Sequence, residues 1–408
     1  MRDRRSRRTF AGLAVLALTA TFAGAAAANH DRRAADTVTV DTLPIANALP
    51  LDLGVKKGFF EAQGITIKKT TLQSGNDIVL ALANHNGDVG YLGYVPMMIA
   101  RTQGIPLQVV AASEVEGTSA ADNWQNILVK GSSSIHSPQD LIGKTVAVNA
   151  LKGVGEVVIR AAFKKLGLNP NGVKLLAMPF PTMRTALNNG QVDAIWVPEP
   201  FLSQGLNLDG DRIVMAPGPT VGKFFPNGGY AALQSWAASN PSLARRFRTA
   251  LNQSLTYAQT HTDEIRAMLP AGSQNSRLAI WSTLVDRGQL AQLAKYAKEF
   301  GVINTLPNLT QLVPASIASG LTIQGTVASG VTLKLDGKPF KTLNAGKYAF
   351  VVNDRSKANN FHLRGPGVNR STSVPRTGTS TFVVTLAKGT YTYGSDGKAS
   401  KKGSFKVA

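Results

Sequence analysis

The sequence predicts an α/β protein of two lobes, followed by a small all-β unit. From residue 37 onward, short β-branched runs alternate with segments of helical periodicity, which is the pattern of parallel βαβ units. A second set of such units begins near residue 120 and repeats the plan. Residues 321–408 consist of short β-rich runs separated by turns, which is typical of a small sandwich.

Composition supports a folded chain and excludes several kinds of chemistry. Of the 408 residues, 43% are hydrophobic and 17% are charged, which is the balance of a protein with a buried core. The sequence contains no cysteine, so disulfides, thiolate nucleophiles, iron–sulfur clusters and cysteine-based zinc sites are excluded. An anchor attached through an N-terminal cysteine is excluded as well. We expect no metal and no cofactor.

Residues 1–28 have the pattern of a secretory signal peptide. Five arginines precede an apolar run over 10–28 that ends in four alanines, where a signal peptidase can cut. Residues 6–10 (SRRTF) also resemble the twin-arginine export motif, and an ordinary positively charged start is the alternative. We therefore expect an exported, soluble, periplasmic or otherwise extracytoplasmic protein without a lipid anchor.

The first lobe is predicted to begin with three strands and two helices. The strands are expected over 38–42, 65–69 and 89–92, and the helices over 49–60 and from residue 74 onward. Apolar residues four positions apart give the first helix an inward face: Leu51, Val55 and Phe59.

The second lobe is expected over about 120–211 with the same alternation. Its predicted elements are strands over 127–129, 145–148 and 193–196, and helices over 155–166 and 183–189. After about residue 211 the chain is expected to return to the first lobe, and it becomes mostly helical over 241–300.

Four segments give the chain a family resemblance. Residues 54–64 (GVKKGFFEAQG), 83–94, 139–146 (QDLIGKTV) and 186–201 resemble, in order, motifs of the substrate-binding proteins for sulfonates, nitrate, taurine and thiamine precursors. The resemblance implies that residues 29–320 form a two-lobed clamp of the periplasmic-binding-protein type II. It also implies capture of a small molecule for the permease of an ABC importer.

A clamp of this kind is expected to hold its ligand between the lobes. Open α/β sheets bind ligands at the carboxyl ends of their strands, where helix N-termini favour anions. The candidates are amide, hydroxyl, aromatic and charged residues, together with a glycine that permits close backbone approach. The predicted ligand-binding residues are Asn47, Ser74, Gly75, Asn76, Tyr94, Trp124, Asn149, Lys152 and Glu199.

Several of these residues have a structural alternative. Ser74 is a good helix cap whatever its function. Tyr94 and Trp124 are of a type that often lies in the core, and Glu199 is placed to bridge the lobes.

We expect the lobes to close on the ligand by a hinge.

The ligand class stays open between a sulfonate, a nitrate-like anion and a pyrimidine-type molecule. Sulfonate-type members of the resembled family often place a hydroxyl residue just after a Lys-Gly pair. In this chain the pair is Lys152-Gly153, and the next residue is Val154.

Residues 321–408 resemble a cupredoxin that has lost its copper ligands. The resemblance rests on residues 348–367 and 386–398, and a cupredoxin site needs two histidines and a cysteine. The corresponding positions hold Asn359, Lys398 and Ser395, and lysines occupy the region of the axial methionine. We expect a Greek-key sandwich without copper, in which His362 has a structural role.

Charge is unevenly distributed along the chain, whose net charge is +20. Residues 1–28 carry +4, residues 29–320 carry +5, and residues 321–408 carry 14 basic and 3 acidic residues. No stripe of interleaved aromatic and basic residues of the kind that stacks bases is present, so nucleic acid is not an expected partner. The basic C-terminal unit is compatible with an anionic cell-envelope surface.

Two other functions are alternatives to solute transport. Fungal thiamine-pyrimidine synthases share the predicted fold but carry a cysteine-rich iron motif, and this chain has neither cysteine nor a Ser-His-Asp order among its five histidines. We therefore expect that the protein is not an enzyme. A ligand sensor or a cell-surface attachment protein that uses the same clamp without transport is the alternative.

Overall fold

The structure is a computed structural model, and it describes residues 35–408 except 320, 336–338, 344, 375–376 and 398–401. The predicted export signal over 1–28 lies outside the described residues, as does Lys398.

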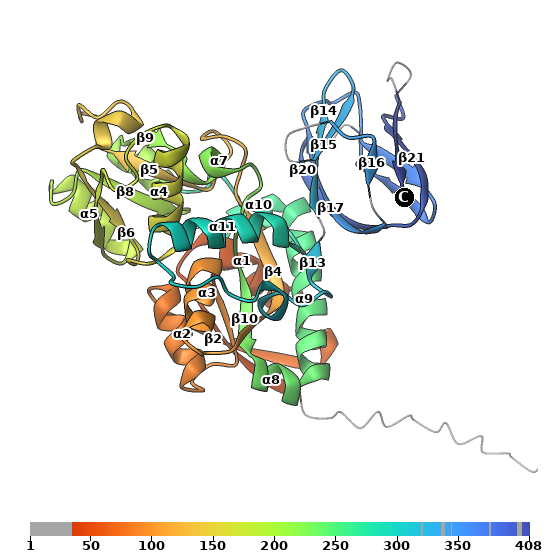
Figure 1. Ribbon diagram of the computed structural model, residues 1–408, viewed down its shortest axis with the longest axis horizontal. Helices are drawn as coiled ribbons and strands as arrows, with labels where there is room; N and C mark the ends of the chain where they lie inside the picture. The colour runs from red at the N-terminus through yellow and green to blue at the C-terminus, as the bar shows by residue number, and fades with distance from the viewer. Residues whose placement is uncertain (1–34, 320, 336–338, 344, 375–376, 398–401) are drawn as a thin grey trace, which may run out of the picture. The chain divides into compact units, whose positions relative to one another are not determined.

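The first lobe is built on a mixed six-stranded sheet (Figure 1). Its strand order is β11-β4-β10-β3-β1-β2, in which β1 runs parallel to β2 and β3, whereas β10 runs antiparallel to β3 and β4. The strands are β1 (Asp36–Thr42), β2 (Ile65–Thr71), β3 (Val89–Gly93), β4 (Leu107–Val115), β10 (Pro226–Leu233) and β11 (Ile280–Trp281).

The helices around this sheet come from both ends of the lobe. Those from the first half are η1 (Ala46–Ala48), α1 (Leu49–Lys56), η2 (Glu61–Gln63), α2 (Gly75–Ala83) and α3 (Tyr94–Thr102). Those from the later half are α8 (Gln234–Ser239), α9 (Pro241–Thr260), α10 (Thr262–Arg266), α11 (Arg287–Glu299) and α12 (Leu309–Leu312). A short parallel pair, β12 (Val285–Asp286) with β13 (Ala318–Ser319), follows α10.

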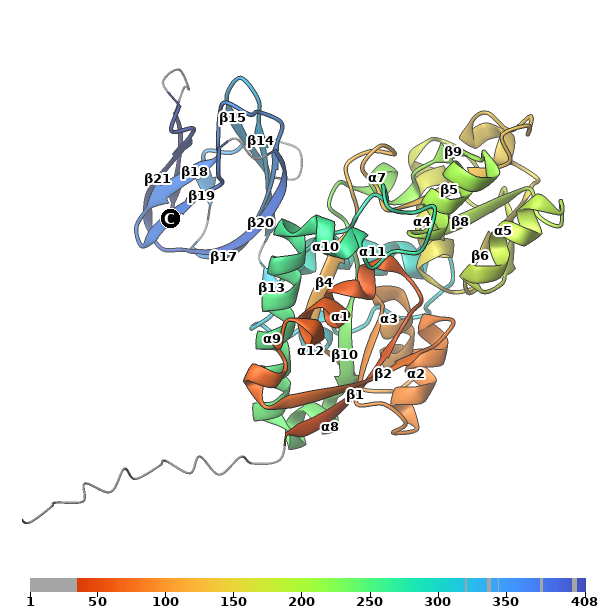
Figure 2. The ribbon, with the colours of Figure 1, turned by 180° about the vertical axis from the view of Figure 1, so that it is seen from behind.

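The second lobe is built on a five-stranded sheet of order β7-β6-β8-β5-β9. Its strands are β5 (Gln125–Val129), β6 (Thr145–Val148), β7 (Lys174–Ala177), β8 (Ala194–Pro198) and β9 (Arg212–Met215). Its helices are η3 (Pro138–Leu141), α4 (Val154–Lys165), α5 (Phe180–Asn188), α6 (Phe201–Gln204), the π-helical turn η4 (Gly205–Asp209) and α7 (Pro217–Val221). Figure 2 shows α5 beside β6 and β8. Because β9 pairs with β5, this sheet continues past residue 211, where the chain was expected to leave it.

Two chain crossings and one helix connect the lobes. The crossings run between β4 and β5 and between β9 and β10, and the backbone N–H of Glu116 in the first donates to the carbonyl of Phe225 in the second (2.8 Å). Helix α11 packs against α3 of the first lobe and α4 of the second. An ion pair between Lys164 of α4 and Glu299 of α11 (2.5 Å) joins them further.

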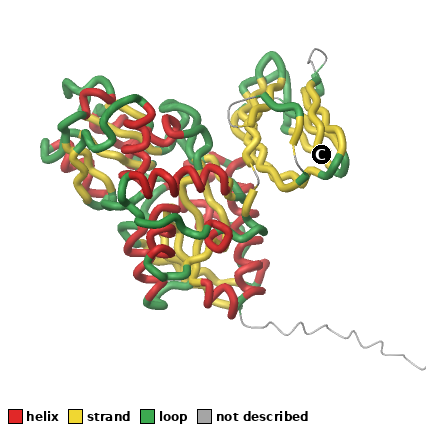
Figure 3. The backbone as a smooth tube through the Cα atoms, viewed as in Figure 1, coloured by secondary structure: helices red, strands yellow, loops and turns green. Residues whose placement is uncertain are grey.

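The C-terminal part consists of strands and loops in its described residues (Figure 3). One sheet has the order β15-β14-β17-β20, and the other has the order β16-β22-β21-β18-β19. The strands are β14 (Leu321–Val327), β15 (Val331–Leu335), β16 (Thr342–Leu343), β17 (Gly346–Asp354), β18 (His362–Gly365), β19 (Val368–Ser371), β20 (Gly378–Leu386), β21 (Gly389–Gly394) and β22 (Gly403–Val407). Both sheets contribute to a hydrophobic core of their own, centred on Phe350, Phe361 and Tyr391.

The first predicted helix is shorter than its apolar spacing suggested. It ends at Lys56, and Gly58 adopts a positive φ of 73° that turns the chain away. Val55 is consequently 47% exposed and does not belong to the inward face on which Leu51 is buried.

Candidate ligand-binding cleft

A small cavity, here called the cleft cavity, lies where strand ends of the two lobes meet. Its volume is about 40 Å³, which is room for about three water molecules. The first lobe contributes residues that follow β1, begin α2 and end β3, and the second lobe contributes residues that follow β6 and belong to β8. Three of the predicted ligand-binding residues line it: Gly75, Trp124 and Asn149.

Helices from both lobes begin at the cleft cavity, among them α2 and α4. Helix α2 starts at Gly75 and α4 starts directly after Gly153, and both glycines line the cavity. The first N–H groups of a helix have no partner within the helix and lie at the positive end of its dipole. The N-cap residue of α4 is Gly153, which has no side chain with which to cap the helix. The cavity therefore favours a ligand group that is anionic or accepts hydrogen bonds.

The lobes touch each other at this point. A Cβ added to Gly93 of the first lobe would lie 2.4 Å from Cγ2 of Val154 in the second. Val154 is the residue at which the family resemblance leads one to expect a hydroxyl. Its methyl groups thus fill space at the meeting of the lobes and offer no hydrogen bond to a ligand.

Trp196 is a candidate ligand contact that the sequence analysis missed. It lines the cleft cavity, is 3% exposed, and its Nε1–H has no hydrogen-bond partner among the described residues. A buried donor without an acceptor costs about 1–3 kcal/mol, so an acceptor atom of a ligand would relieve that cost. The sequence feature that could have identified Trp196 is an aromatic residue within a strand that ends at the cleft.

Two amide side chains of the cavity wall are already engaged. Gln125 and Asn227 both line the cavity, and both donate to Oε1 of Glu116. The distance from Asn227 Nδ2 is 2.7 Å. Their N–H groups therefore hold the hinge carboxyl of Glu116 in place.

The structure places Ser74 in the role of a helix cap. Its Oγ accepts from the backbone N–H of Asp77 (3.2 Å) and donates to Oδ2 of the same residue (2.8 Å). Asn76 is exposed and does not line the cleft cavity. Of the three neighbouring residues predicted to contact the ligand, Ser74, Gly75 and Asn76, only Gly75 lines the cleft cavity.

Three further predicted ligand residues lie outside the cleft cavity. Asn47 is 1% exposed, and its backbone carbonyl accepts from Nε1 of Trp281 (3.3 Å). Tyr94 is 1% exposed in the core of the first lobe, where burial raises the pKa of its hydroxyl well above its ordinary value. Lys152 is exposed, and its backbone N–H donates to Oε2 of Glu156 (2.8 Å).

Glu199 is fully buried and is surrounded by protein donors. Its carboxylate accepts from Ser203 N (2.9 Å), Ser203 Oγ (2.8 Å), Ser276 Oγ (2.9 Å) and Arg277 N (2.9 Å). Its backbone carbonyl accepts from Ala46 N of the first lobe (2.8 Å). Burial raises the pKa of Glu199, and these hydrogen bonds act in the opposite direction. The residue therefore ties together three separate stretches of chain, which is the structural alternative considered for it.

Two buried glutamates make stability depend on pH. Glu114 and Glu116 are 2% and 0% exposed, and burial raises the pKa of each from 4.5 to about 7. Glu114 also accepts a hydrogen bond from the hydroxyl of Tyr91 (2.9 Å). Between the two pKa values the unfolded chain releases these protons while the folded chain keeps them. The folded state therefore loses stability as the pH rises from about 4.5 to about 7.

We expect Glu116→Gln to stabilise the protein at pH 8 and to have little effect at pH 5. Glutamine keeps an oxygen for Gln125 and Asn227 and removes the buried charge, which is worth on the order of 1–3 kcal/mol at the higher pH. Urea unfolding of both proteins at the two pH values measures the difference, with Glu61→Gln at an exposed position as the control. An equal effect of Glu116→Gln at both pH values would contradict the assignment.

Two general features of the described residues bear on the site. None of their helices has the length and apolar character needed to cross a membrane. Within the same residues, no three side chains of histidine, cysteine, aspartate or glutamate gather closely enough to hold a metal ion.

Solved structures of periplasmic binding proteins have a similar fold. The alkanesulfonate-binding protein SsuA from Xanthomonas axonopodis pv. citri bound to MOPS superposes with a TM-score of 0.56 at 20% identity, covering 69% of this chain and 97% of that one. The periplasmic nitrate-binding protein NrtA from Synechocystis PCC 6803 superposes with a TM-score of 0.55 at 16% identity, covering 65% of this chain and 82% of that one. The lobes and their cleft have the mixed α/β fold of a periplasmic binding protein.

Sequence relatives give the family. Residues 46–265, more than half of the chain, match the NMT1/THI5-like family, and the chain belongs to that family. The taurine-binding periplasmic protein of Escherichia coli (strain K12) is 28% identical over 195 residues, or 46% of this chain and 56% of that protein. A putative aliphatic sulfonates-binding protein of Bacillus subtilis (strain 168) is 28% identical over 220 residues, or 53% and 64%. The chain thus spans between half and two thirds of these two relatives.

Proposed function

We propose that this protein is an extracytoplasmic solute-binding protein that captures a small organic or oxyanion ligand for an ABC importer. The observation that carries the proposal is the cleft cavity, where both lobes contribute a helix N-terminus and Trp196 contributes a buried donor without a partner. We propose binding without a chemical step as the role of this site.

The ligand classes that fit the cleft cavity are a sulfonate, a nitrate-like anion and the polar edge of a pyrimidine. Each offers acceptor atoms to the N–H groups at the starts of α2 and α4 and to Trp196. The similarity to taurine-binding and sulfonates-binding proteins favours the sulfonate among them. Val154 argues for recognition through backbone and indole N–H groups, since no hydroxyl is present at that position.

We expect Trp196→Phe to weaken ligand binding about tenfold. The change removes one buried donor and keeps an aromatic ring, and one hydrogen bond to a charged group contributes about 1.5–3 kcal/mol. Isothermal titration of residues 29–408 with a panel of sulfonates, taurine, nitrate and thiamine-precursor pyrimidines measures the change. Trp236→Phe is the matched control, because Trp236 lies in α8 and does not line the cleft cavity. Unchanged affinity in Trp196→Phe would remove the indole from the site.

We propose that residues 1–28 direct export and are removed, and that the mature protein remains without a lipid anchor. The similarity to a periplasmic taurine-binding protein supports the export. The N-terminal sequence of the secreted protein tests it, with cleavage near residue 28 as the expected result.

We further propose that residues 321–408 form a cupredoxin-like Greek-key sandwich that has given up copper. At the expected ligand positions, Asn359 Nδ2 donates to the carbonyl of Ala328 (2.8 Å) and Ser395 Oγ donates to Oδ1 of Asn360 (3.2 Å). His362 is bonded through Nδ1 to Asp396 (2.8 Å). These contacts give the side chains structural partners in place of a metal. Stoichiometric copper binding by the full mature chain would contradict the proposal.

A second function, attachment to an anionic cell-envelope polymer, is favoured by one observation. The C-terminal sandwich exposes lysines and arginines on several strands and loops: Lys334, Lys341, Lys357, Arg370, Lys388 and Lys406. We expect the mature protein to bind polyphosphate at low salt and to lose that binding as ionic strength rises. Replacing Lys334, Lys388 and Lys406 together with glutamine should weaken this binding and leave the affinity for the solute unchanged. Polyphosphate binding by the triple variant that equals that of the parent protein would contradict attachment through these lysines.

A ligand sensor would use the same cleft without transport. Genes for a permease and an ATPase beside this one favour import, whereas a neighbouring histidine kinase or chemoreceptor favours sensing.

A further inference from the structure

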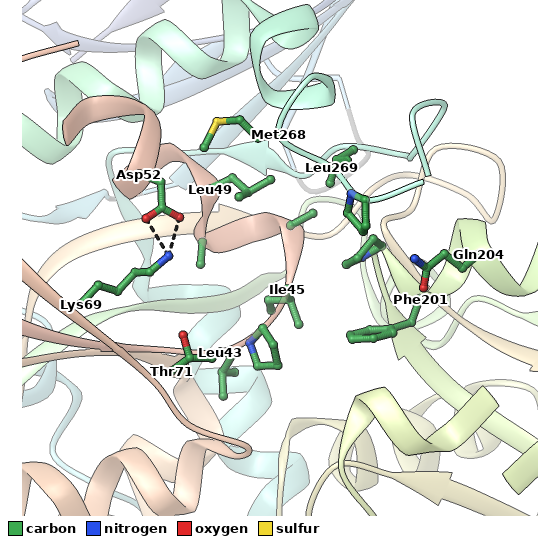
Figure 4. A pocket seen from close by; sticks show the side chains of 15 residues that line it. Leu43, Ile45, Leu49, Asp52, Lys69, Thr71, Phe201, Gln204, Met268 and Leu269 are labelled. Carbon is green, nitrogen blue, oxygen red and sulfur yellow. Dashed lines mark hydrogen bonds and ion pairs between the residues drawn. The ribbon is translucent and has the colours of Figure 1, made fainter. Parts of the chain in front are cut away.

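A larger cavity of about 330 Å³, lined by residues of both lobes, has its charged side chains already paired. Figure 4 shows Lys69 pointing toward Asp52, and Lys69 Nζ lies 2.7 and 2.8 Å from the two carboxylate oxygens. A ligand that needs free hydrogen-bond donors is therefore better served by the cleft cavity. The segments that carry the donors of the cleft cavity then decide how well a ligand is held.

One of these segments is the loop between β6 and α4, residues 149–153, here called the α4 loop. Asn149, Ala150 and Gly153 of this loop line the cleft cavity, as does Val154, the first residue of α4. The loop is tightly folded, since a Cβ added to Gly153 would lie 3.0 Å from the carbonyl oxygen of Ala150. The path of the α4 loop therefore sets the position of the N–H groups at the start of α4.

The α4 loop contains a residue whose backbone conformation needs support. Lys152 has a positive φ of 52°, which residues other than glycine seldom adopt. Leu151 and Lys152 are both exposed, so burial of their side chains does not hold the loop in this form. Because such conformations persist where the surrounding structure fixes them, the loop needs a contact at its backbone.

Glu156 supplies this contact. It is the third residue of α4 and is 8% exposed, and its Oε2 accepts a hydrogen bond from the backbone N–H of Lys152 (2.8 Å). The arrangement is similar to a capping box, in which an acidic side chain of the first turn accepts from a backbone N–H at the helix start. The carboxylate of Glu156 thus holds the α4 loop at its strained residue.

Arg160 fixes this carboxylate from the other side. Its Nε donates to Oε1 of Glu156 (3.0 Å) from one turn further along α4. Its Nη1 donates to the carbonyl of Pro170 (3.2 Å) and to Oδ1 of Asn171. One carboxylate oxygen of Glu156 therefore holds the loop, and the other is held by Arg160.

We propose that Glu156 is a positioning residue for ligand capture, and that Arg160 acts through it. Glu156 does not line the cleft cavity. Its carboxylate fixes the α4 loop, and the loop fixes the N–H groups at the start of α4. This inference rests on the proposed capture function.

The sign of the effect separates positioning from simple electrostatics. Glu156 carries a negative charge close to a site that favours anions, and removing a like charge strengthens the binding of an anion. Loss of a positioning residue instead weakens binding. A variant without the carboxylate therefore gives opposite results under the two interpretations.

The first experiment is isothermal titration of residues 29–408 with the panel of sulfonates, taurine, nitrate and thiamine-precursor pyrimidines. We expect Glu156→Ala to bind about tenfold more weakly than the parent protein. Glu156→Gln keeps an acceptor for the N–H of Lys152 and should stay within about threefold of the parent. Glu61→Ala, at an exposed glutamate of η2, is the control.

Two double variants test whether the effect passes through the loop. Arg160→Met should weaken binding about threefold in the parent and should have no further effect in Glu156→Ala, because residues that act through one contact are not additive. Glycine adopts a positive φ readily, so Lys152→Gly combined with Glu156→Ala should bind more tightly than Glu156→Ala alone. Additive losses in both pairs would overturn the proposal.

Hydrogen exchange of the backbone N–H of Lys152 tests the contact without a ligand. We expect this exchange to be about tenfold faster in Glu156→Ala than in the parent and unchanged in Glu61→Ala. Equal exchange in Glu156→Ala and the parent would overturn the proposal, and so would an affinity of Glu156→Ala equal to or above that of the parent. Failure of every panel member to bind the parent would overturn the capture function, while the exchange would still show whether Glu156 holds the loop.

Discussion

Replacing Gly93 with leucine should abolish ligand capture while the protein remains folded. The backbone of Gly93 is extended (φ −67°), so leucine is tolerated there without strain. Its Cβ, however, would already lie 2.4 Å from Cγ2 of Val154 in the opposite lobe. A leucine side chain must push the lobes apart, and we expect the affinity to fall by about 100-fold or more, or about 2.7 kcal/mol.

A compensating pair of changes makes this prediction specific. Gly93→Ala adds only the Cβ and should weaken binding less than leucine does. Adding Val154→Ala removes the methyl group that the Cβ meets and should restore the affinity. Gly330→Leu is the control, because a side chain at that glycine meets no atom within 4 Å. Isothermal titration measures all four variants, and wild-type affinity in Gly93→Leu would show that the ligand binds elsewhere.

Replacing Glu199 with alanine should cause the largest loss of stability. The change leaves the N–H and hydroxyl of Ser203, the hydroxyl of Ser276 and the N–H of Arg277 without their acceptor in a fully buried site. Each buried donor without a partner costs about 1–3 kcal/mol, and we expect a total of about 4 kcal/mol after local rearrangement.

Two related variants distinguish structure from ligand binding at this position. Glu199→Gln keeps the size but turns an amide N–H toward these donors, and we expect about half of the loss. Glu61→Ala, at an exposed glutamate, should be neutral. Urea unfolding gives the free energies. An unchanged unfolding midpoint in Glu199→Ala, together with lost ligand affinity, would instead return Glu199 to the ligand site predicted from the sequence.

The regular elements of both lobes were predictable because their patterns are local. Residues 145–148 form a strand as the β-branched run indicated, and Gly167 and Gly190 end their helices with a positive φ. The end of the second lobe was not predictable in this way. Strand β9 was missed because its assignment depends on pairing with β5, which is more than 80 residues earlier in the chain.

The candidate site was predictable only in part, since sequence position gives the strand end but not the direction of a side chain. Gly75, Trp124 and Asn149 line the cleft cavity, whereas Tyr94 starts a helix and turns into the core.

Thermal unfolding of residues 29–408 and of the Gly93→Leu variant, each with and without the ligand panel, tests the central claim most directly. A ligand at 100 times its Kd stabilises the folded form by about 2.7 kcal/mol, which raises Tm by several degrees. We predict that at least one member of the panel raises the Tm of the parent and leaves that of Gly93→Leu unchanged. An equal increase in both proteins would contradict capture between the lobes, and no increase with any member of the panel would contradict the ligand class.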